Sequence, residues 1–273
     1  NPFADAVAIK DGKFLAVVST AEVMLYAGPQ ATTLDLTGHT AIPGLNDSHL
    51  HLIRGGLNYN LELRWEGVPS LADALRMLKE QALRTPSPQW VRVVGGWTEF
   101  QFAERRMPTL DEINAAAPDT PVFILHLYDR ALLNRAALRV VGYTRDTPNP
   151  PGGEIQRDDK GNPTGMLIAR PNAMLLYATL AKGPKLPLEQ QVNSTRQFMR
   201  ELNRLGLTSA IDAGGGFQNY PEDYQVIAEL HDKKQLTLRI AYNLFTQRPG
   251  HEVEDFERWT DMLKPGQGTD FYR

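Results

Sequence analysis

The sequence predicts an α/β fold built from three consecutive parts, and three observations support this. The first 44 residues contain short alternating runs typical of strands, and the middle of the chain mixes strand and helix patterns. From Glu189 onward the order is helix, strand, helix, strand, which is typical of parallel strands joined by crossover helices. With 273 residues, 42% of them apolar, the chain can bury a substantial core.

The N-terminal part is predicted to form a small β structure. Alternating runs at 4–10 and 13–19 flank Asp11-Gly12, which is a strong hairpin turn signal. A third alternating run covers 32–38. Two or three strands do not form a stable sheet alone, so we expect this part to need strand partners from elsewhere.

The middle of the chain is predicted to mix strands and helices. Ser70 is the expected N-cap of one helix, and Thr109 with Glu112 forms a capping box at the start of another. The predicted elements are a buried strand at 39–52, a helix at 70–84, a strand at 90–97, a helix at 109–118, a strand at 120–127, a helix at 131–142 and a Pro/Gly-rich loop and hairpin at 147–165.

The last third is predicted to contain parallel βα units. A long amphipathic helix at 188–206 closes on Gly206, and a strand at 207–216 ends in a glycine run. A helix at 220–236 and a strand at 237–245 continue the alternation.

Composition excludes several classes of partner and site. The net charge is −3 and no Lys/Arg run stands out, so we expect no nucleic-acid partner. Cysteine is absent, which excludes disulfides and thiolate ligands, so any metal must be held by His, carboxylate or water. No long apolar span or signal-peptide pattern is present. We therefore expect a cytoplasmic protein without a membrane partner.

The stretch AIPGLNDSHLHL, Ala41 to Leu52, carries two of the six histidines, one residue apart. Side chains alternate along a strand, so His49 and His51 point to the same face, about 7 Å apart along the chain. That spacing allows two imidazoles to bind one divalent metal ion. The alternative is two polar residues on a solvated strand face. The apolar flanks favour an interior strand, where buried imidazoles need a partner such as a metal ion.

The segment IPGLNDSHLHL resembles the P-G-[FL]-x-D-x-H-x-H signature of the amidohydrolase superfamily. Five more stretches resemble, in the same order, the subgroup that contains the N-substituted formamide deformylases. These stretches are GGWTEF, PTLDEINAAAPDTPVF, LLNRAALRVVG, PGGEIQRDDKGNPTG and LNRLGLTSAIDAG. The resemblance covers nearly all of the chain.

In that superfamily the signature forms the first strand of a (β/α)₈ TIM barrel, and both histidines bind a divalent metal ion, commonly zinc. The resemblance therefore implies that His49 and His51 are metal ligands and that zinc is the cofactor. It also implies a partial (β/α)₈ barrel with a small N-terminal β-sandwich piece and an α/β insertion. The corresponding parts are a sandwich piece at 1–43, a first barrel strand at 44–66, an α/β insertion domain at 67–171 and further βα units of an incomplete barrel at 172–273.

The family's remaining metal ligands are histidines on later barrel strands and an aspartate, also the usual base, on the last strand. No other histidine of this chain lies in a matching motif. A zinc hydrolase site needs about three protein ligands plus water, and this sequence offers two. We therefore expect residues to be missing before Asn1, the catalytic base to lie beyond Arg273, and the 273-residue chain alone to be inactive.

The chain departs from its relatives at two places inside the resemblance. Related sequences often carry Asp-Gly-His where this chain has Leu127-Tyr128-Asp129, and often an acidic residue at the position of Ala169. Both departures weaken the expectation of a second metal ion and of the usual substrate contacts.

Five other residues are site candidates. Asp47 could orient an imidazole as a hydrogen-bond acceptor, or make a local turn contact. Trp97 and Glu99 follow a strand end and could line a substrate pocket, or be a packed indole and an exposed carboxylate. His126 could line the pocket or be a satisfied structural histidine. Asp212 ends a predicted barrel strand, where catalytic groups gather, but could equally cap the loop.

Three functions remain open from the sequence. The first is a metal-dependent hydrolase of non-peptide carbon–nitrogen bonds, amide or formamide, in which metal-activated water attacks a small-molecule substrate. The second is an inactive truncated or split amidohydrolase fragment. The third is a non-catalytic α/β protein whose histidines contact a ligand. For a barrel with an open edge, a homodimer is a further expectation.

Overall fold

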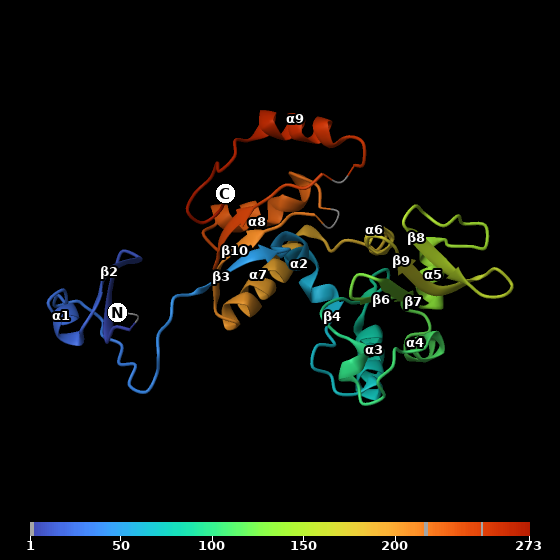
Figure 1. The fold of residues 1–273 in the computed structure, drawn as a ribbon, viewed down its shortest axis with the longest axis horizontal. Coiled ribbons are helices and arrows are strands. Elements are labelled where there is room, and N and C mark those ends of the chain that lie inside the picture. Colours follow the sequence, from blue (N-terminus) through green and yellow to red (C-terminus); the bar gives the residue numbers. More distant parts are fainter. Residues whose placement is uncertain (1–2, 216–217, 247) are drawn as a thin grey trace. The chain divides into compact units, whose positions relative to one another are not determined.

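The computed structural model describes residues 3–215, 218–246 and 248–273, so Gly216, in the predicted glycine run, lies outside the described residues. The chain divides into two compact units, Asn1–Pro43 and Gly44–Arg273. The first unit is a hairpin with a short helix, and the second contains two separate sheets (Figure 1).

The first unit contains the predicted hairpin. Strands β1 (Ala6–Lys10) and β2 (Lys13–Val18) pair in antiparallel register. Asp11 and Gly12 between them have φ angles of 51° and 73°, the left-handed conformation that a two-residue hairpin turn requires. A short helix, α1 (Thr20–Met24), follows.

The prediction of a third strand at 32–38 is wrong. The backbone N–H of Thr37 donates to Asp35 Oδ1 at 2.9 Å, a local turn contact that bends the chain. Leu34 and Leu36 are exposed, and no described strand pairs with this run. Alternating residues form a strand only where a partner strand satisfies the backbone. The β-sandwich stays a prediction.

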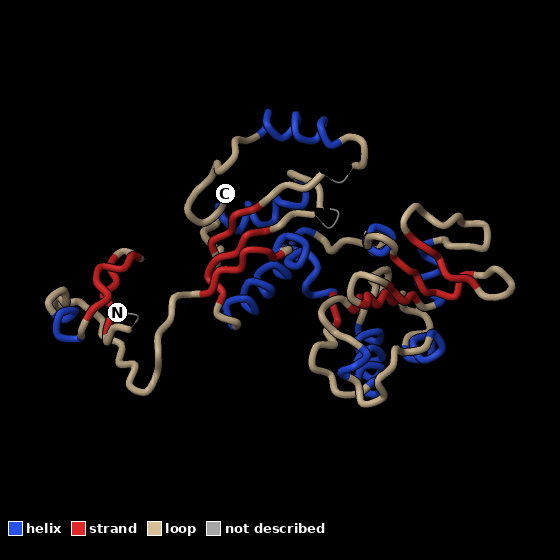
Figure 2. Tube along the Cα trace, in the orientation of Figure 1, coloured by secondary structure: helices blue, strands red, loops and turns tan. Residues whose placement is uncertain are grey.

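The second unit contains a three-stranded parallel sheet in the order β11–β10–β3 (Figure 2). The central strand β10 (Leu207–Asp212) pairs in parallel with β3 (Leu45–Leu50) and with β11 (Arg239–Tyr242). This confirms the parallel arrangement that the helix–strand alternation predicts.

Three helices share a core with this sheet: α2 (Leu52–Asn58), α7 (Leu188–Arg204) and α8 (Gln225–Asp232). The predicted amphipathic helix is α7, and Gly206 beyond its end has a φ of 88°, which favours glycine. The core includes Leu52, Ile53, Leu57, Val192, Met199, Leu202, Ala210, Ile227, Leu230 and Ile240.

Strand β3 lies at the edge of this sheet, which corrects the prediction that it is buried. It pairs only with β10 among the described strands. Leu45, Asn46, Ser48 and His49 along it are exposed. An edge strand leaves one row of backbone groups without a strand partner, so apolar flanks alone do not imply burial.

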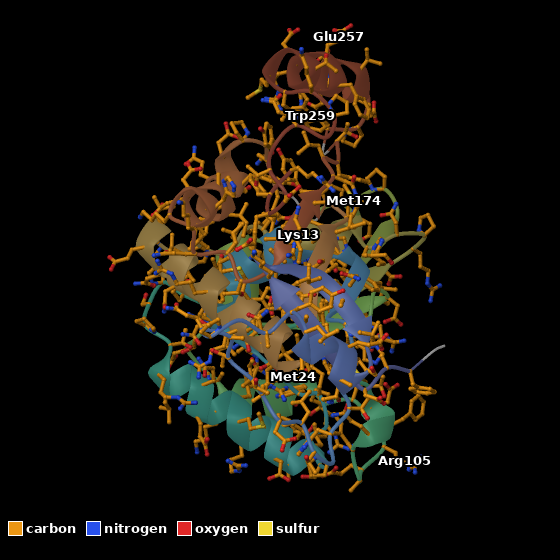
Figure 3. The ribbon with its side chains drawn as sticks, turned by 90° about the vertical axis from the view of Figure 1, so that its left-hand side faces the viewer. Lys13, Met24, Arg105, Met174, Glu257 and Trp259 are labelled. Atoms are coloured by element: carbon orange, nitrogen blue, oxygen red, sulfur yellow. The ribbon has the colours of Figure 1, made fainter. Side chains whose placement is uncertain are left out.

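Helix α9 (Glu252–Met262) follows β11. Trp259 on it is buried while Glu257 is exposed, and Figure 3 labels both. Beyond the helix, Tyr272 forms a parallel bridge with Ile240 of β11. A further helical crossover therefore returns the chain parallel to β11. These parallel strands are compatible with part of a barrel, and the closed (β/α)₈ barrel stays a prediction.

The second unit also contains a six-stranded mixed sheet. Its strands in spatial order are β4 (Glu62–Leu63), β5 (Val91–Val93), β6 (Val122–His126), β7 (Arg130–Leu133), β9 (Pro163–Ala169) and β8 (Gly153–Arg157). Strands β4 to β6 run parallel, and the remaining pairs are antiparallel. The sheet lies within the predicted insertion apart from β4. The boundaries of that insertion and of the barrel segments stay predictions.

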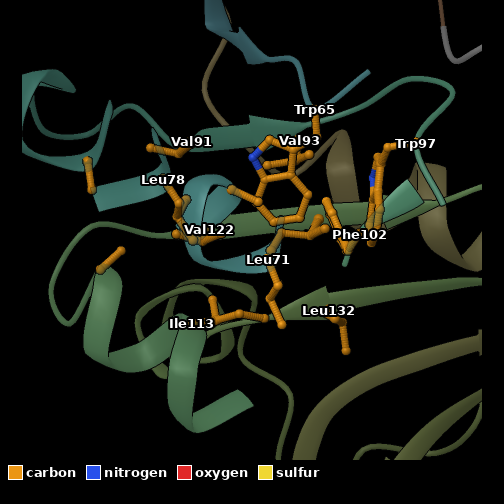
Figure 4. Packing of buried hydrophobic residues seen from close by; sticks show 14 residues of the cluster. Trp65, Leu71, Leu78, Val91, Val93, Trp97, Phe102, Ile113, Val122 and Leu132 are labelled. Carbon is orange, nitrogen blue, oxygen red and sulfur yellow. The ribbon is translucent and has the colours of Figure 1, made fainter. Parts of the chain in front are cut away.

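Alternate residues of this sheet face two different helical layers. On β6, Val122 and Ile124 join one core and Phe123 joins the other. Helices α3 (Leu71–Arg84) and α4 (Leu110–Ala116) cover the first face, shown in Figure 4, and α5 (Arg135–Val141) and α6 (Met174–Leu180) cover the second. Three short 3₁₀ turns are η1 (Tyr59–Leu61), η2 (Glu99–Gln101) and η3 (Glu222–Tyr224). Within the described residues, every helix is too short or too polar to cross a lipid bilayer.

The predicted helix starts at Ser70 and Thr109 are confirmed. Ser70 Oγ accepts the backbone N–H of Asp73 at 3.0 Å, and Thr109 forms the reciprocal capping box with Glu112. These contacts satisfy backbone donors that the first helical turn leaves free.

The predicted helix at 131–142 is only partly correct. Its first three residues belong to β7, which pairs with β6 on one side and β9 on the other. The helix begins after Asn134, whose side chain accepts the backbone N–H of Ala137 at 2.9 Å. Apolar residues between two strands gain a complete set of ladder hydrogen bonds, which outweighs their helix propensity.

Candidate metal centre

The histidine pair lies at the carboxyl end of β3. His49 is on the strand, and His51 follows it at the N-cap position of α2. The two ring centroids are 5.4 Å apart, with the ring planes at 83°. The carboxyl ends of parallel strands are where α/β sheets bind ligands.

The loop after β10 fixes the orientation of the His51 ring. Its Nδ1 lies 2.7 Å from the carbonyl oxygen of Gly214. A carbonyl oxygen only accepts hydrogen bonds, so Nδ1 carries a proton. In the neutral imidazole, Nε2 then keeps its lone pair, which is the form that binds a metal ion.

Asp212 supports this loop from the end of β10. The side chain is buried, and its Oδ2 accepts the backbone N–H of Ile53 at 2.7 Å while Oδ1 accepts that of Gly214 at 2.8 Å. Burial raises the pKa of Asp212, although these two hydrogen bonds and the nearby His51 lower it in part. The contacts are those of a capping aspartate, which joins the first turn of α2 to the loop that holds His51.

Asp47 contacts the backbone of the histidine pair. Its Oδ1 accepts the backbone N–H of His49 at 2.9 Å. Within the described residues, its carboxylate makes no hydrogen bond to either imidazole. Asp47 therefore fixes the strand end that carries His49, and a role in orienting an imidazole stays a prediction.

The two imidazoles fit a divalent ion as two of its ligands. With Nδ1 of His51 hydrogen-bonded to Gly214, Nε2 is the ring nitrogen left for a metal ion, and the exposed ring of His49 makes no hydrogen bond within the described residues. Those residues contain no group of three or more His, Asp or Glu side chains that could hold a metal ion. A hydrolytic zinc site therefore needs about one more protein ligand than the described part of the chain supplies.

Trp97 lies in the core of the six-stranded sheet, as expected for the alternative of a packed indole and not for a residue in a pocket wall. Its side chain is fully buried, and Nε1 donates to the carbonyl oxygen of Leu125 at 2.9 Å. It packs against Trp65 and Phe102 (Figure 4). An indole that is buried and hydrogen-bonded in this way has no surface left for a ligand.

Glu99 and His126 come together beside this core. His126 is 4% exposed, with Nε2 2.8 Å from Glu99 Oε2 and Nδ1 3.0 Å from Asp129 Oδ1. Arg130 donates to Asp129 from Nε and Nη2. Partial burial raises the pKa of both carboxyl groups, but hydrogen bonds from the backbone and His126 to Glu99, and from Arg130 and His126 to Asp129, lower it more. Both carboxylates are therefore ionised at neutral pH.

The structure thus separates the candidates into two groups. Asp47, Asp212 and the histidine pair gather at the carboxyl end of the parallel sheet. Glu99 and His126 form a second cluster, and within the described residues no hydrogen bond, ion pair or ring contact joins the two groups. Gly214 and Asp129 were not predicted as site residues. The glycine run after Asp212 was a signal for a carbonyl at a tight loop.

A parallel α/β sheet with an imidazole pair at its carboxyl edge defines this chain as an α/β protein with a candidate metal centre. The sequence profile of the amidohydrolase family matches residues 32–270, and the chain belongs to this family. The match includes both His49 and His51.

Two curated relatives match over most of this chain. The N-substituted formamide deformylase of Arthrobacter pascens is 31% identical over 215 residues, covering 78% of this chain and 40% of the relative. The protein LONG AFTER FAR-RED 3 of Arabidopsis thaliana is 31% identical over 217 residues, covering 79% of this chain and 36% of the relative. The chain therefore spans less than half the length of these relatives.

Solved structures share the fold. A metal-dependent hydrolase of Pyrococcus horikoshii aligns with a TM-score of 0.57 at 19% identity, over 97% of this chain and 48% of that protein. A metal-dependent hydrolase of Pyrococcus furiosus aligns with a TM-score of 0.55, also at 19% identity, over 98% of this chain and 50% of that protein.

Proposed function

We propose that this chain is part of a metal-dependent hydrolase that cleaves non-peptide carbon–nitrogen bonds of the amide or formamide type. Family membership supports the reaction class. The observation that carries the proposal is the hydrogen bond from His51 Nδ1 to the Gly214 carbonyl, with the His49 ring 5.4 Å away. A histidine on a solvated face needs no fixed tautomer, whereas a metal ligand does.

Zinc is the ion that we propose for this pair. When bound, zinc supplies a water molecule of lowered pKa and polarises a carbonyl oxygen. The chain's own residues have supporting tasks. The Gly214 carbonyl keeps the proton on Nδ1 of His51, so that Nε2 stays free to bind. Asp212 holds the N–H of Gly214 and thereby the position of that carbonyl.

The proposed substrate is a small N-substituted amide or formamide. The Arthrobacter relative is named for N-substituted formamides, and its match covers 78% of this chain. The exposed position of His49 at the sheet edge leaves the metal accessible to a small molecule.

Zinc binding by the 273-residue chain tests this proposal without reference to activity. We expect replacement of His49 and His51 by Asn to weaken zinc binding by more than about tenfold, because each substitution removes a metal–nitrogen bond. His39→Asn is the matched control, since His39 is exposed and, within the described residues, its ring hydrogen-bonds only to the carbonyl oxygen of Thr37. Isothermal titration with zinc measures both. Equal affinity in the double variant and the control contradicts the proposal.

Activity is expected to require more than the described residues. They supply two ligands, and a hydrolytic zinc site uses about three plus water. We therefore expect no turnover of N-substituted formamides by this chain with zinc added. In a longer protein that contains it, the His49 and His51 substitutions should abolish turnover.

A further inference from the structure

The six-stranded sheet carries a cavity that the metal-centre proposal does not use. Its volume is about 290 Å³. On one face, the cross-strand pair Leu132 and Met166 packs in the core under α3 and α4. The next pair outward is Arg130 and Ile168, which are half-buried. The cavity lies where this second pair, Met166 and the exposed Arg170 meet.

The wall of this cavity contains one carboxylate, Asp129, whose charge is already neutralised. Its Oδ2 accepts from Arg130 Nε at 3.0 Å and Nη2 at 2.8 Å, and its Oδ1 contacts His126. Both oxygens are therefore engaged. An incoming anion would meet an ion pair here and not a free negative charge.

Of the charged groups that line the cavity, Asp129 and Arg130 neutralise each other through two hydrogen bonds. His126 and Glu99, whose Nε2 and Oε2 lie 2.8 Å apart, do not line the cavity.

Arg170 then leaves the cavity with a net positive charge. Within the described residues its guanidinium has no ion-pair partner, and it is exposed at the rim. The Nη1 of Arg130 is also without a hydrogen bond in that part of the chain. Glu154 is the cross-strand partner of Ile168 on β8 and so shares this face, but it does not line the cavity.

We propose that this cavity binds a small organic carboxylate, with its charged end on Arg170 and Arg130 and its short apolar chain on Met166 and Ile168. Guanidinium groups match the planar carboxylate and bind it through charge-assisted hydrogen bonds. The two apolar side chains give the ligand's hydrocarbon part a surface to bury. The volume, near the lower end of ligand pockets, restricts the occupant to a small molecule.

Butanoate is the probe that tests this site in the 273-residue chain, with butanamide as its uncharged isostere. We expect saturable butanoate binding by isothermal titration, and about tenfold or more weaker binding in Arg170→Gln, from loss of a charge-assisted contact. Arg139→Gln on α5 removes an exposed arginine that does not line the cavity and should leave binding unchanged. Thermal unfolding of each variant verifies that it is folded.

The titrations are made with a chelator present and repeated in the His49 and His51 double Asn variant. A carboxylate held by a metal would be lost under these conditions, whereas the cavity site should be unaffected. Three results would overturn the proposal. The first is an affinity for butanamide equal to that for butanoate. The second is an affinity of Arg170→Gln for butanoate equal to that of the native chain. The third is no saturation by butanoate up to about 10 mM.

Discussion

At the scale of single residues, the position of one ring proton decides which nitrogen of a histidine can bind a metal ion. Nδ1 of His51 donates a hydrogen bond to the Gly214 carbonyl, which leaves Nε2 for a metal ion, and Asp212 accepts the backbone N–H of Gly214. The ring is therefore oriented through a chain of contacts that joins two strands. The metal ion would be the last partner in an arrangement that the protein already forms.

Asp212→Asn tests this chain of contacts. An amide of the same shape turns one acceptor into a donor opposite a backbone N–H, so we expect a loss of about 1–3 kcal/mol in the free energy of unfolding. Zinc affinity should fall roughly 10–100-fold, as for other groups that support a ligand. Urea unfolding and zinc titration measure the two effects. Asp47→Asn affects one hydrogen bond, to the backbone of His49, and should reduce both the free energy of unfolding and the zinc affinity less than Asp212→Asn does. The reverse order would refute the role given to Asp212.

At the scale of elements, the sequence correctly predicted helix starts where the N-cap residue contacts residues within the first helical turn. Ser70 and Thr109 each cap a helix through residues three positions later. The prediction of a helix was wrong at 131–133, where apolar residues with helix propensity form part of β7, which pairs with strands on both sides. A cap is satisfied within one turn, whereas strand pairing depends on residues far away in sequence.

The capping carboxylate of α4 predicts a pH dependence of stability. A hydrogen bond from Arg106 lowers the pKa of Glu112 to about 2, against partial burial, and Thr109 adds to the effect. A carboxyl whose pKa is lower in the folded state stabilises the fold above its unfolded value of 4.5, and this contribution is lost as pH falls toward about 2. We expect Glu112→Gln to be less stable than the native chain at pH 7.

Urea midpoints measured from pH 7 down to about pH 2 check this prediction. The gap between the native chain and Glu112→Gln should close as the pH falls. Glu80→Gln removes the exposed ion pair of Glu80 with Arg76 and should produce a smaller gap. A gap that is constant with pH would show that the capping carboxylate acts without its charge.

At the scale of the whole molecule, the chain consists of separate units with different degrees of burial. The hairpin of the first unit exposes Ile9, Phe14 and Val17, whereas the second unit has three buried cores. A two-stranded hairpin is marginal alone, and its apolar faces need covering. The predicted sandwich partners, or a second copy in a homodimer, are occupants that would cover them.

Removal of residues 1–43 tests the independence of the units. Because the second unit has its own cores, we expect its thermal midpoint to change by less than about 2 °C. Self-association should decrease, since the exposed apolar hairpin is removed. Circular dichroism and analytical ultracentrifugation measure these outcomes. A fall of about 10 °C in the midpoint would mean that the hairpin is part of the core of the second unit.

The sequence by itself determined the Asp11-Gly12 hairpin, the capped helices, the parallel βα units and the proximity of His49 to His51. Each depends on residues a few positions apart, whose turn chemistry and periodicity act locally. Only the tertiary structure decided that β3 is an edge strand, that Trp97 is core, and that Gly214 holds His51. It also brought Glu99 to His126 and Asp129. These features depend on contacts between segments distant in sequence, for which local pattern carries no information.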